Sequence, residues 1–264
     1  MEPKQIDKQK GRYLVKTDLV IVTYNSVSYI QRCLEAIRTY TPPGYTIIVV
    51  DNGSTDGTLE YLQSFGNIEL IENGQNKGYA SAVNLGIKNG TSETIVIMNP
   101  DVFVTENWLP PLMDTLWKEE QTAIVAPKLI NSSNQLVGVG TNWDWTSPYF
   151  LCPNEPGILE ETRACLAING ACFLLKRHLL DKLGLLDEHY FHYFEETDYC
   201  FNAIHCGYNI LFCPDSTIYH EYYPNPARDE AIKQYWVQSE THFNRKWSYQ
   251  GNGIVAKNVQ KEGG

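Results

Sequence analysis

Asn99, Pro100 and Asp101 directly follow the apolar run from Thr94 to Met98, which is typical of a buried strand. Because proline cannot donate a hydrogen bond to a sheet, the strand should end there and Asp101 should lie in a fixed turn. A carboxylate at the carboxyl edge of an open α/β sheet lies where such folds bind their ligands, and its oxygens are hard ligands for a divalent cation. The pattern therefore predicts a site for a metal ion and phosphate; the alternative is a turn that only caps the next helix.

Polar clusters follow four apolar strands of this chain or open the next helix. They are Thr23-Tyr24-Asn25-Ser26, Asp51-Asn52-Gly53-Ser54, Asn76-Lys77-Gly78-Tyr79 and Asn99-Pro100-Asp101. Because the carboxyl ends of parallel strands meet at one edge of a sheet, these clusters should converge on one crevice. The Asp51 carboxylate could accept hydrogen bonds from a base or a ribose there, and the turn at Gly53 would let backbone amides approach a ligand closely. A plain helix start at residues 51–56 would look much the same.

The later half of the chain contains a group of carboxylates, Glu195, Glu196 and Asp198, at the start of a predicted helix. They come just after an aromatic stretch at residues 190–194, Tyr-Phe-His-Tyr-Phe. An ionised glutamate can accept a hydroxyl proton, so one of them could serve as a general base. The alternative is an ordinary acidic first turn of a helix. His220 ends another strand-like run and could supply an imidazole to the metal of Asp101, although a lone histidine at a strand end is more often structural.

Aromatic side chains also gather in the loop-like segment 142–157, at Trp143, Trp145 and Tyr149. They could belong to the core, or they could stack on a sugar ring. No G-x-G-x-x-G follows the first strand, which makes a dinucleotide site unfavourable, and no G-x-x-x-x-G-K-[ST] is present, which excludes an ordinary P-loop.

The elements that must position these residues follow from the apolar pattern. Runs of strand length at residues 19–22, 47–50, 68–71 and 94–98 alternate with helical patterns. We expect helices after a capping box of Ser28 and Gln31, at residues 58–65 and at residues 79–90, where Tyr79 falls on the apolar face. Strands that alternate with helices predict right-handed βαβ crossovers and a mostly parallel sheet.

Beyond Asp101 the pattern becomes mixed. We expect a helix at residues 106–118, short strands near residues 123–130 and 171–175, and a helix from the acidic group through Gly207. A last amphipathic helix at residues 227–247 should pack on the sheet.

The composition excludes several classes of function. With 264 residues, of which 43% are hydrophobic, the chain can form a sizeable core. A formal net charge of −10 and the lack of a Lys/Arg cluster argue against nucleic-acid partners and against a polybasic membrane patch. The seven cysteines stand in apolar contexts without zinc spacing, so we expect reduced thiols and a cytoplasmic location. No apolar run approaches the ~18 residues of a membrane span, so any membrane association should be peripheral.

Taken in order, six motifs of this sequence resemble those of family 2 glycosyltransferases with the GT-A fold, and most closely the rhamnosyltransferase-like branch. The motifs are Val22-Thr23-Tyr24-Asn25, Val50 to Gly57, Asn76-Lys77-Gly78-Tyr79-Ala80, Met98-Asn99-Pro100-Asp101, Asn169-Gly170-Ala171-Cys172 and Phe194 to Asp198. The resemblance implies an α/β fold of the GT-A type, which is a Rossmann-like, mostly parallel central sheet flanked by helices, with a smaller mixed subregion on the acceptor side.

The resemblance also implies a division of the chain. Residues 1–17 would be an N-terminal extension, 18–101 the nucleotide-sugar-binding half, and 102–225 the acceptor-binding and catalytic half of the same domain. Residues 226–250 would form a C-terminal helix, and residues 251–264 a disordered tail.

The resemblance further implies the roles of individual residues. A nucleotide-diphosphate sugar of the dTDP or UDP type would contact Thr23, Tyr24, Asn25, Asp51, Asn52, Asn76, Lys77, Gly78, Asn99 and Asp101. The donor sugar or the acceptor would contact Gly170, Trp143, Trp145, Tyr190 and His192. Asp101 would be the metal carboxylate of a D-x-D-type motif, with His220 as a further ligand of Mg²⁺ or Mn²⁺. Glu196 would be the catalytic base, with Glu195 or Asp198 as alternatives.

The implied reaction is an inverting transfer of a sugar, with rhamnose as one candidate, to a hydroxyl of a glycan or lipid-linked acceptor at the inner membrane face. This sequence departs from the family pattern at three positions. Asn99 replaces the first acidic residue of the metal motif, Glu196 stands where Asp is commoner, and Asn202 stands where many relatives have Arg. The first two departures favour the alternative of a non-catalytic sugar-nucleotide or glycan-binding protein. A nucleotidyltransferase would need a basic, Gly-rich loop, which residues 23–28 lack.

Overall fold

A computed structural model describes residues 15–140, 160–221 and 226–247 of the chain. The predicted tail, most of the predicted N-terminal extension and the three aromatic residues of segment 142–157, Trp143, Trp145 and Tyr149, lie outside the described residues.

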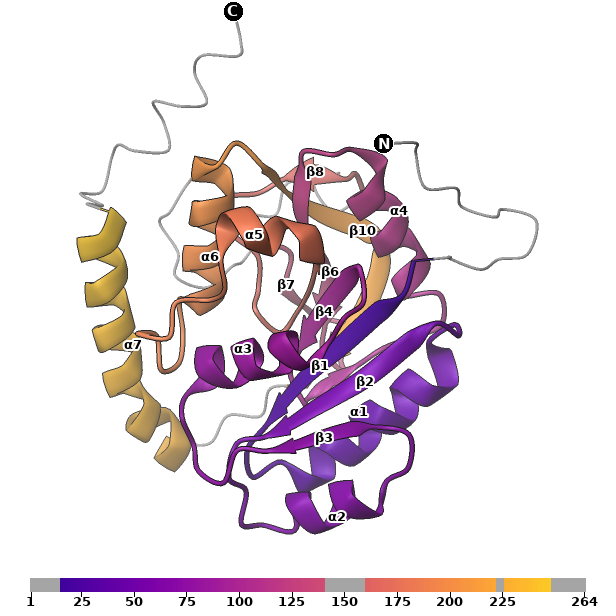
Figure 1. The fold of residues 1–264 in the computed structure, drawn as a ribbon, viewed down its shortest axis with the longest axis vertical. Coiled ribbons are helices and arrows are strands. Elements are labelled where there is room, and N and C mark those ends of the chain that lie inside the picture. The colour runs from indigo at the N-terminus through magenta and orange to yellow at the C-terminus, as the bar shows by residue number, and fades with distance from the viewer. Residues whose placement is uncertain (1–14, 141–159, 222–225, 248–264) are drawn as a thin grey trace, which may run out of the picture.

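The first half of the chain forms the parallel part of one central sheet (Figure 1). Strands β1 (Thr17–Thr23), β2 (Tyr45–Asp51), β3 (Glu69–Glu72) and β4 (Thr94–Met98) lie in the order β3-β2-β1-β4, and each pair in that order is parallel. Helices α1 (Val27–Tyr40), α2 (Thr58–Ser64) and α3 (Tyr79–Asn89) form the crossovers. The predicted βαβ pattern is confirmed. The strand predicted at 68–71 lies at the edge of the sheet and is partly exposed, so it is not a buried strand.

The second half extends the same sheet in a mixed way. Strand β9 (Cys172–Lys176) inserts antiparallel between β4 and β6 (Thr122–Ile130), and β10 (Asn209–His220) runs parallel to β6. The short strands β5 (Val102–Phe103), β7 (Leu136–Gly138) and β8 (Arg163–Ala164) add antiparallel pairs to β10 or β6. The helices of this half are α4 (Leu109–Lys118), the 3₁₀ turn η1 (Arg177–Leu179), α5 (Leu180–Leu183) and α6 (Glu195–His205).

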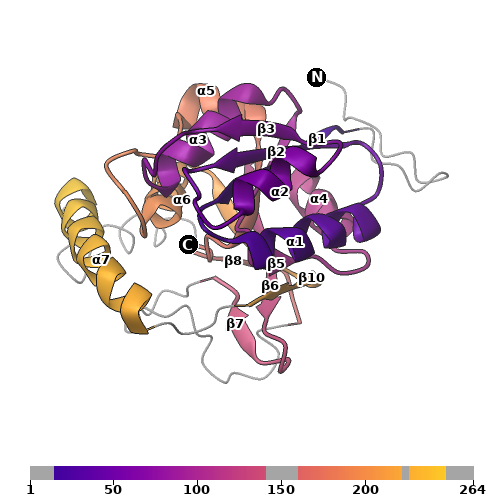
Figure 2. The ribbon, with the colours of Figure 1, turned by 90° about the horizontal axis from the view of Figure 1, so that it is seen from below.

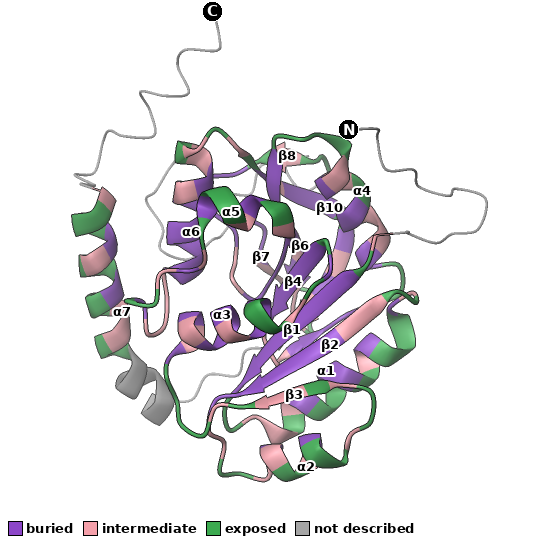
Figure 3. Ribbon diagram, in the orientation of Figure 1, coloured by how far each residue is buried: buried purple, intermediate pink, exposed green. Residues whose placement is uncertain are grey.

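Alternation along the strands builds two cores, one on each face of the sheet. In β1, Leu19 and Ile21 face one core, whereas Val20 and Val22 face the other. Helices α1, α2 and α4 cover the first face, and α3, α5 and α6 cover the second (Figure 2). Because both faces are covered, β1 and β4 are buried along their length and β2 from Ile47 on (Figure 3), which explains their continuous apolar runs.

Two predicted details of the helices are wrong. Helix α1 begins at Val27 after Ser26, so Ser28 and Gln31 do not form a capping box. The backbone N–H of Val27 instead donates to Oδ2 of Asp56 (3.2 Å), a cap from the next loop that local spacing could not reveal. Helix α4 begins at Leu109 rather than at residue 106.

The long helix α7 (Pro226–Trp247) lies at the flank of the molecule and does not pack on the sheet as predicted (Figures 1 and 2). Its aromatic residues contact the aromatic stretch before α6 instead. Phe243 packs against Phe194 and Phe201, and Tyr235 stacks on Phe191 with ring centroids 4.6 Å apart. Both faces of the sheet are already covered, and this helix packs on the aromatic stretch instead.

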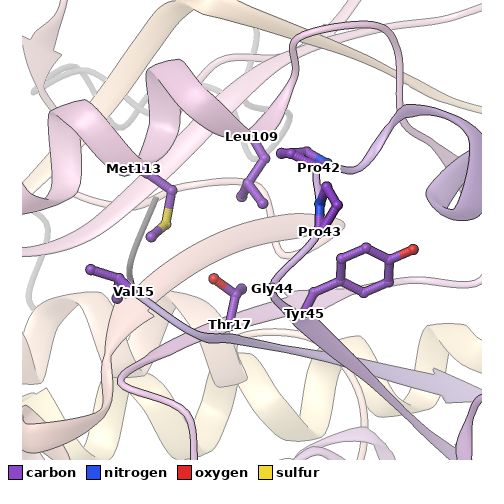
Figure 4. Close-up of a pocket in the computed structure, with 8 residues that line it drawn as sticks. All are labelled: Val15, Thr17, Pro42, Pro43, Gly44, Tyr45, Leu109 and Met113. Atoms are coloured by element: carbon purple, nitrogen blue, oxygen red, sulfur yellow. The ribbon is translucent and has the colours of Figure 1, made fainter. Parts of the chain in front are cut away.

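Among the residues that the structure describes, no helix is long and apolar enough to cross a bilayer. The six described cysteines are free thiols, as predicted, and all except Cys206 are buried. A small pocket lies at the amino ends of β1 and β2, where Thr17, Tyr45 and Met113 line it (Figure 4). The predicted site lies at the opposite, carboxyl edge of the sheet.

Candidate active site

Asp101 and His220 lie together at the carboxyl edge of the sheet. After β4 ends at Met98, residues 99–101 form the predicted turn, and β5 returns antiparallel to β10 so that Val102 pairs with His220. The backbone N–H of Glu221 donates to the Asp101 carbonyl (3.0 Å), which fixes the turn. Nε2 of His220 lies 3.5 Å from Oδ1 of Asp101, and this buried carboxylate oxygen has no hydrogen-bond partner. A carboxylate oxygen and an imidazole nitrogen in this arrangement fit a divalent cation such as Mn²⁺.

Asp51 and Thr23 form the neighbouring part of the edge, at the ends of β2 and β1. The two residues are register partners in the sheet. Oδ2 of Asp51 accepts from the backbone N–H groups of Gly53 (3.1 Å) and Ser54 (3.0 Å), so the predicted turn is present. Oδ1 of Asp51 and Oγ1 of Thr23 are buried and have no hydrogen-bond partner. Both oxygens are therefore available to a ligand at the strand ends.

Asn52 ties the loops of the nucleotide half to one another. Its Oδ1 accepts from Nδ2 of Asn73 (2.8 Å) and from the Lys77 backbone N–H (3.2 Å). Its Nδ2 donates to Oδ1 of Asn76 (3.0 Å) and to the Gly78 carbonyl (3.2 Å). Both ends of the amide are used by the protein itself, so Asn52 positions the loops and has little left to offer a base or ribose.

The other predicted nucleotide contacts are more open. Tyr24 is exposed, and so are Asn25, Asn76 and Lys77. Oδ1 of Asn25 accepts from the Thr55 backbone N–H (2.8 Å), and Nζ of Lys77 donates to Oδ1 of Asn73 (2.8 Å). Asn99 is partly buried, and its backbone N–H donates to the Ala171 carbonyl (2.9 Å).

Glu195 and Glu196 are buried at the start of α6, next to strained backbone. The two residues before them, Tyr193 (φ 71°) and Phe194 (φ 69°), are both in the left-handed region, which bulky side chains rarely adopt. Burial and the neighbouring Glu196 charge raise the pKa of Glu195 well above its usual range. Burial raises the pKa of Glu196 to about 7. Two buried carboxyl groups side by side cannot both ionise readily, so the pair retains a proton to higher pH than a free glutamate would.

Gly170 makes room for Glu196. A Cβ atom at this glycine would lie 3.1 Å from Cδ of Glu196, closer than ordinary contact. Oε1 of Glu196 accepts from the Thr197 hydroxyl (3.3 Å). The predicted motif around Gly170 thus lies against the predicted base, although the two are separated by a strand, a short helix and the aromatic stretch.

Tyr79 is the residue of this site whose role the sequence did not reveal. It was assigned to the apolar face of α3, yet its hydroxyl is buried without a hydrogen-bond partner. The pKa of Tyr79 is raised well above its usual range by burial and then by the charges of Glu195, Glu196 and Asp101. The Tyr79 hydroxyl is therefore close enough to the acidic pair and to Asp101 for their charges to act on it. Its place directly after Gly78, inside a polar cluster, was the available signal.

Buried oxygens that lack a partner are concentrated at this edge. Within the residues that the structure describes, six buried side-chain oxygens have no hydrogen-bond partner. They belong to Thr23, Asp51, Tyr79, Asp101, Glu195 and Thr122. All except that of Thr122 belong to the site. Because buried polar groups in folded proteins are nearly always hydrogen-bonded, such a concentration marks a place for a polar ligand.

Asp198 has a different environment from the two glutamates. Its Oδ1 accepts from Tyr190 OH (3.0 Å) and from Nε1 of Trp247 (2.8 Å). Its Oδ2 accepts from Nζ of Lys246 (2.8 Å). These bonds join α6 to α7. Tyr190 is fully buried in this contact, and the His192 carbonyl accepts from the Ser239 hydroxyl of α7 (2.9 Å).

A second group that could hold a metal ion consists of Asp187, His189 and His242, whose ligand atoms lie within 4.8 Å of one another. In the structure, Asp187 Oδ1 is 2.8 Å from Nδ1 of His189, and Oδ2 is 3.1 Å from Nε2 of His242. Nζ of Lys246 also donates to Oδ2 (2.8 Å). These hydrogen bonds and the Lys246 charge lower the pKa of Asp187 against the effect of its burial. The ammonium group already supplies the positive charge here.

Comparison with known proteins identifies the family. Residues 18–184 match the model of the glycosyl transferase family 2 domain. The chain belongs to glycosyl transferase family 2. The match begins at Asp18, at the second residue of β1, and covers the parallel half of the sheet and β9.

Relatives of known name agree with this assignment. The low-salt glycan biosynthesis hexosyltransferase of Haloferax volcanii is 23% identical over 92% of this chain and 78% of its own length. The N-acetylglucosaminyl-diphospho-decaprenol L-rhamnosyltransferase of Mycobacterium tuberculosis is 27% identical over 81% of this chain and 78% of its own length. The predicted resemblance to the rhamnosyltransferase-like branch is confirmed.

Solved structures show the GT-A fold. GalNAc-T7, solved with UDP, GalNAc and Mn²⁺, superposes with a TM-score of 0.67 at 20% identity over 94% of this chain, which spans 54% of that structure. A mannosyltransferase from Pyrobaculum calidifontis in complex with GDP-Man and Mn²⁺ gives a TM-score of 0.63 at 18% identity over 92% of this chain and 67% of that one. The predicted fold class is therefore confirmed.

Proposed function

We propose that this chain is an inverting, metal-dependent glycosyltransferase that moves a sugar from a nucleotide-diphosphate donor to a hydroxyl of a glycan or lipid-linked acceptor. The observation that carries this proposal is the concentration of unpartnered buried oxygens on Thr23, Asp51, Tyr79, Asp101 and Glu195. They come from both halves of the chain, at the ends of β1 and β2, in the turn after β4 and at the starts of α3 and α6. Open α/β folds bind nucleotides at the carboxyl ends of their strands.

The nucleotide half supplies the binding loops. Thr23 and Asp51 offer oxygens at the ends of β1 and β2 to the base and ribose, while Asn52 holds the loop of Asn76, Lys77 and Gly78 in place. The relatives leave the base open, because one solved neighbour contains UDP and the other GDP-Man. We keep the dTDP or UDP type as the donor class to test first.

Asp101 and His220 would hold the divalent cation, Mg²⁺ or Mn²⁺, with Asn99 unable to add charge. When bound there, such a cation stabilises the negative charge that develops on a nucleoside diphosphate leaving group. Two solved neighbours contain Mn²⁺, which supports the assignment. The unpartnered Oδ1 of Asp101, 3.5 Å from Nε2 of His220, supports it from this chain's own residues.

Glu196 would be the base that removes the proton of the acceptor hydroxyl. Burial raises the pKa of Glu196 to about 7, so its carboxylate can accept a proton near neutral pH. Asp198 is a weaker candidate, because Tyr190, Trp247 and Lys246 already bind its oxygens. A base on the face of the sugar opposite the diphosphate gives single displacement and inversion.

The acceptor class is supported by the relatives alone. The mycobacterial relative is named for a diphospho-decaprenol-linked substrate and for the transfer of L-rhamnose. A lipid-linked acceptor would bring this chain to the inner membrane face as a peripheral enzyme, and rhamnose is one candidate for the transferred sugar.

Calorimetry and product release together test the proposal. Wild-type protein should bind UDP or dTDP with MnCl₂ and lose this affinity with EDTA. It should also release nucleoside diphosphate from at least one UDP- or dTDP-sugar. Binding without any release, with every acceptor tried, would favour the non-catalytic sugar-nucleotide-binding protein. No binding of any nucleotide would refute both functions.

A further inference from the structure

Tyr79 begins α3 at the contact between the two halves of the molecule. Gly78 precedes it with φ +89°, and a Cβ atom there would lie 2.8 Å from the Phe191 carbonyl oxygen. The backbone N–H of Tyr79 donates to that same carbonyl (2.7 Å). The start of α3 is thereby fixed against the aromatic stretch that leads to Glu195 and Glu196. The position of the Tyr79 ring is set by both halves at once.

The Tyr79 hydroxyl is a buried hydrogen-bond donor without a partner. The ring itself is partly exposed and contacts His192 edge to face, with centroids 6.3 Å apart. Burial and then the charges of Glu195, Glu196, Asp101 and Cys172 raise the pKa of Tyr79 well above its usual range. In this surrounding the phenol stays protonated, so it offers a donor and not an anion. Buried tyrosine hydroxyls usually find an acceptor, which here must come from outside the described residues.

The position of the hydroxyl indicates which part of a substrate it would meet. The charges of Asp101, where the diphosphate would be held with the cation, and of the glutamate pair, which would deprotonate the acceptor, both act on it. In a single displacement the transferred sugar lies between the leaving diphosphate and the base. A neutral donor near both groups suits a neutral hydroxyl of a sugar ring.

We propose that the Tyr79 hydroxyl donates a hydrogen bond to a ring hydroxyl of the transferred sugar, and that Tyr79 is a specificity-determining residue of the donor-sugar subsite. This inference rests on the proposed glycosyltransferase function. It separates Tyr79 from the loops around Asp51 and Lys77, which would recognise the nucleotide whatever sugar it carries.

The test compares Tyr79→Phe with wild type on two ligands, each with MnCl₂. One is the UDP- or dTDP-sugar that wild type binds most tightly among a panel, and the other is its parent nucleoside diphosphate. We expect Y79F to bind the nucleotide sugar about tenfold more weakly, measured as an increase in Kd or KM, because one buried hydrogen bond is lost. The diphosphate Kd should change less than about twofold. Tyr61→Phe on α2, outside the site, is the matched control and should change neither constant.

Donors that lack one ring hydroxyl at a time give a second measurement. Wild type should bind the deoxy donor that lacks the partner hydroxyl about tenfold more weakly than it binds the full donor. Y79F should bind the deoxy donor and the full donor equally well. Equal weakening of the diphosphate and the nucleotide sugar by Y79F would assign Tyr79 to the diphosphate and overturn the inference. No effect of Y79F would overturn it as well. If wild type binds the diphosphate but releases no diphosphate from any nucleotide sugar, the proposed function fails, while the binding comparison still decides the role of Tyr79. If wild type binds neither ligand, the proposed function and this inference both fail.

Discussion

Asp18 and Asp101 are carboxylates at opposite ends of neighbouring strands, and their environments differ completely. Asp18, near the start of β1, has each oxygen bound: Oδ1 accepts from the Ser92 hydroxyl (2.6 Å), and Oδ2 accepts from the Ser92 backbone N–H and from Nη2 of Arg177, both at 2.8 Å. Asp101, three residues after β4, leaves a buried oxygen without a hydrogen bond. The Asp18 side chain is 3% exposed and that of Asp101 is 23% exposed.

Carboxylates that stabilise the fold thus differ from those that are left for a ligand. At the amino end, Arg177 also donates to the carbonyls of Ser92 (2.6 Å) and Ile87 (2.8 Å), so charge and hydrogen bonds are complete within the chain. At the carboxyl end, Asp101 and Glu195 each leave a buried oxygen unpaired. A folded chain tolerates such groups where a bound ligand completes them.

The largest expected effect is that of Asp101→Asn. Without the carboxylate charge the site should lose its cation, so release of nucleoside diphosphate from the donor should fall at least about a thousandfold. The transition midpoint for thermal unfolding in EDTA should stay unchanged, because Oδ1 of Asp101 makes no hydrogen bond that the fold requires. Release assays and a Mn²⁺ titration check both parts. Full activity of D101N would show that the unpaired carboxylate of Asp101 does not serve catalysis.

Glu196→Gln should come next, with a loss of turnover of about 300-fold. The amide keeps the shape of the side chain and its position against Gly170, but it cannot take a proton. Donor binding measured by calorimetry should stay within about twofold of wild type.

The pH profile gives the same prediction a second readout. Burial raises the pKa of Glu196 to about 7, so wild-type turnover should rise with pH below that value and level off above it. The residual activity of E196Q should lack this slope. If E196Q turned over at nearly the wild-type rate, the base would have to be assigned to Glu195 or Asp198.

At the other end of the sheet, Asp18→Asn should act on stability and leave catalysis alone. The substitution leaves the Arg177 guanidinium without its buried counter-charge, and we expect the free energy of unfolding to fall by about 3 kcal/mol. Urea denaturation measures this loss. Turnover per folded molecule should be the same as in wild type. A loss below about 1 kcal/mol would mean that the saturated end contributes little to folding.

The sequence predicted the first half of the fold better than the second, for a physical reason. Buried parallel strands such as residues 47–50 read as continuous apolar runs, and their crossovers are local. The antiparallel insertion of β9 between β4 and β6 depends on pairing between segments far apart in the chain, which periodicity does not report. The docking of α7 against Phe191 and Phe194 depends likewise on which surfaces remain uncovered.

The charged members of the candidate site could be predicted from the sequence, whereas the position of the Tyr79 hydroxyl could not. Asp101, His220 and Glu196 carry a charge or an imidazole at a strand or helix end, a signal that spacing preserves. Tyr79 fitted the apolar face of α3 equally well, because a tyrosine ring is apolar and only its hydroxyl is not. The surroundings of that hydroxyl depend on α6, which packs on the same face of the sheet as α3.

The smallest expected effect, Glu195→Gln, tests the acidic pair through stability. Burial and the Glu196 charge hold the pKa of Glu195 well above the value of about 4.3 expected in the unfolded chain. Above that value the unfolded state releases its proton while the folded state retains it. Stability from this group is therefore complete at low pH and is lost as the pH rises from about 4.3 through the raised folded pKa.

Replacing Glu195 by a neutral amide removes that loss. In EDTA, E195Q should be more stable than wild type at pH 8 by about 1 to 2 kcal/mol, and the difference should vanish near pH 4. Urea denaturation at both pH values measures it, with Glu240→Gln on the exposed side of α7 as the matched control that should show no such difference. A destabilised E195Q at pH 8 would mean that the Glu195 carboxylate is paired within the fold, as Asp18 is. Unpaired carboxylate oxygens at the carboxyl edge would then remain at Asp51 and Asp101. An unpaired buried carboxyl group opposes folding unless a ligand compensates for it.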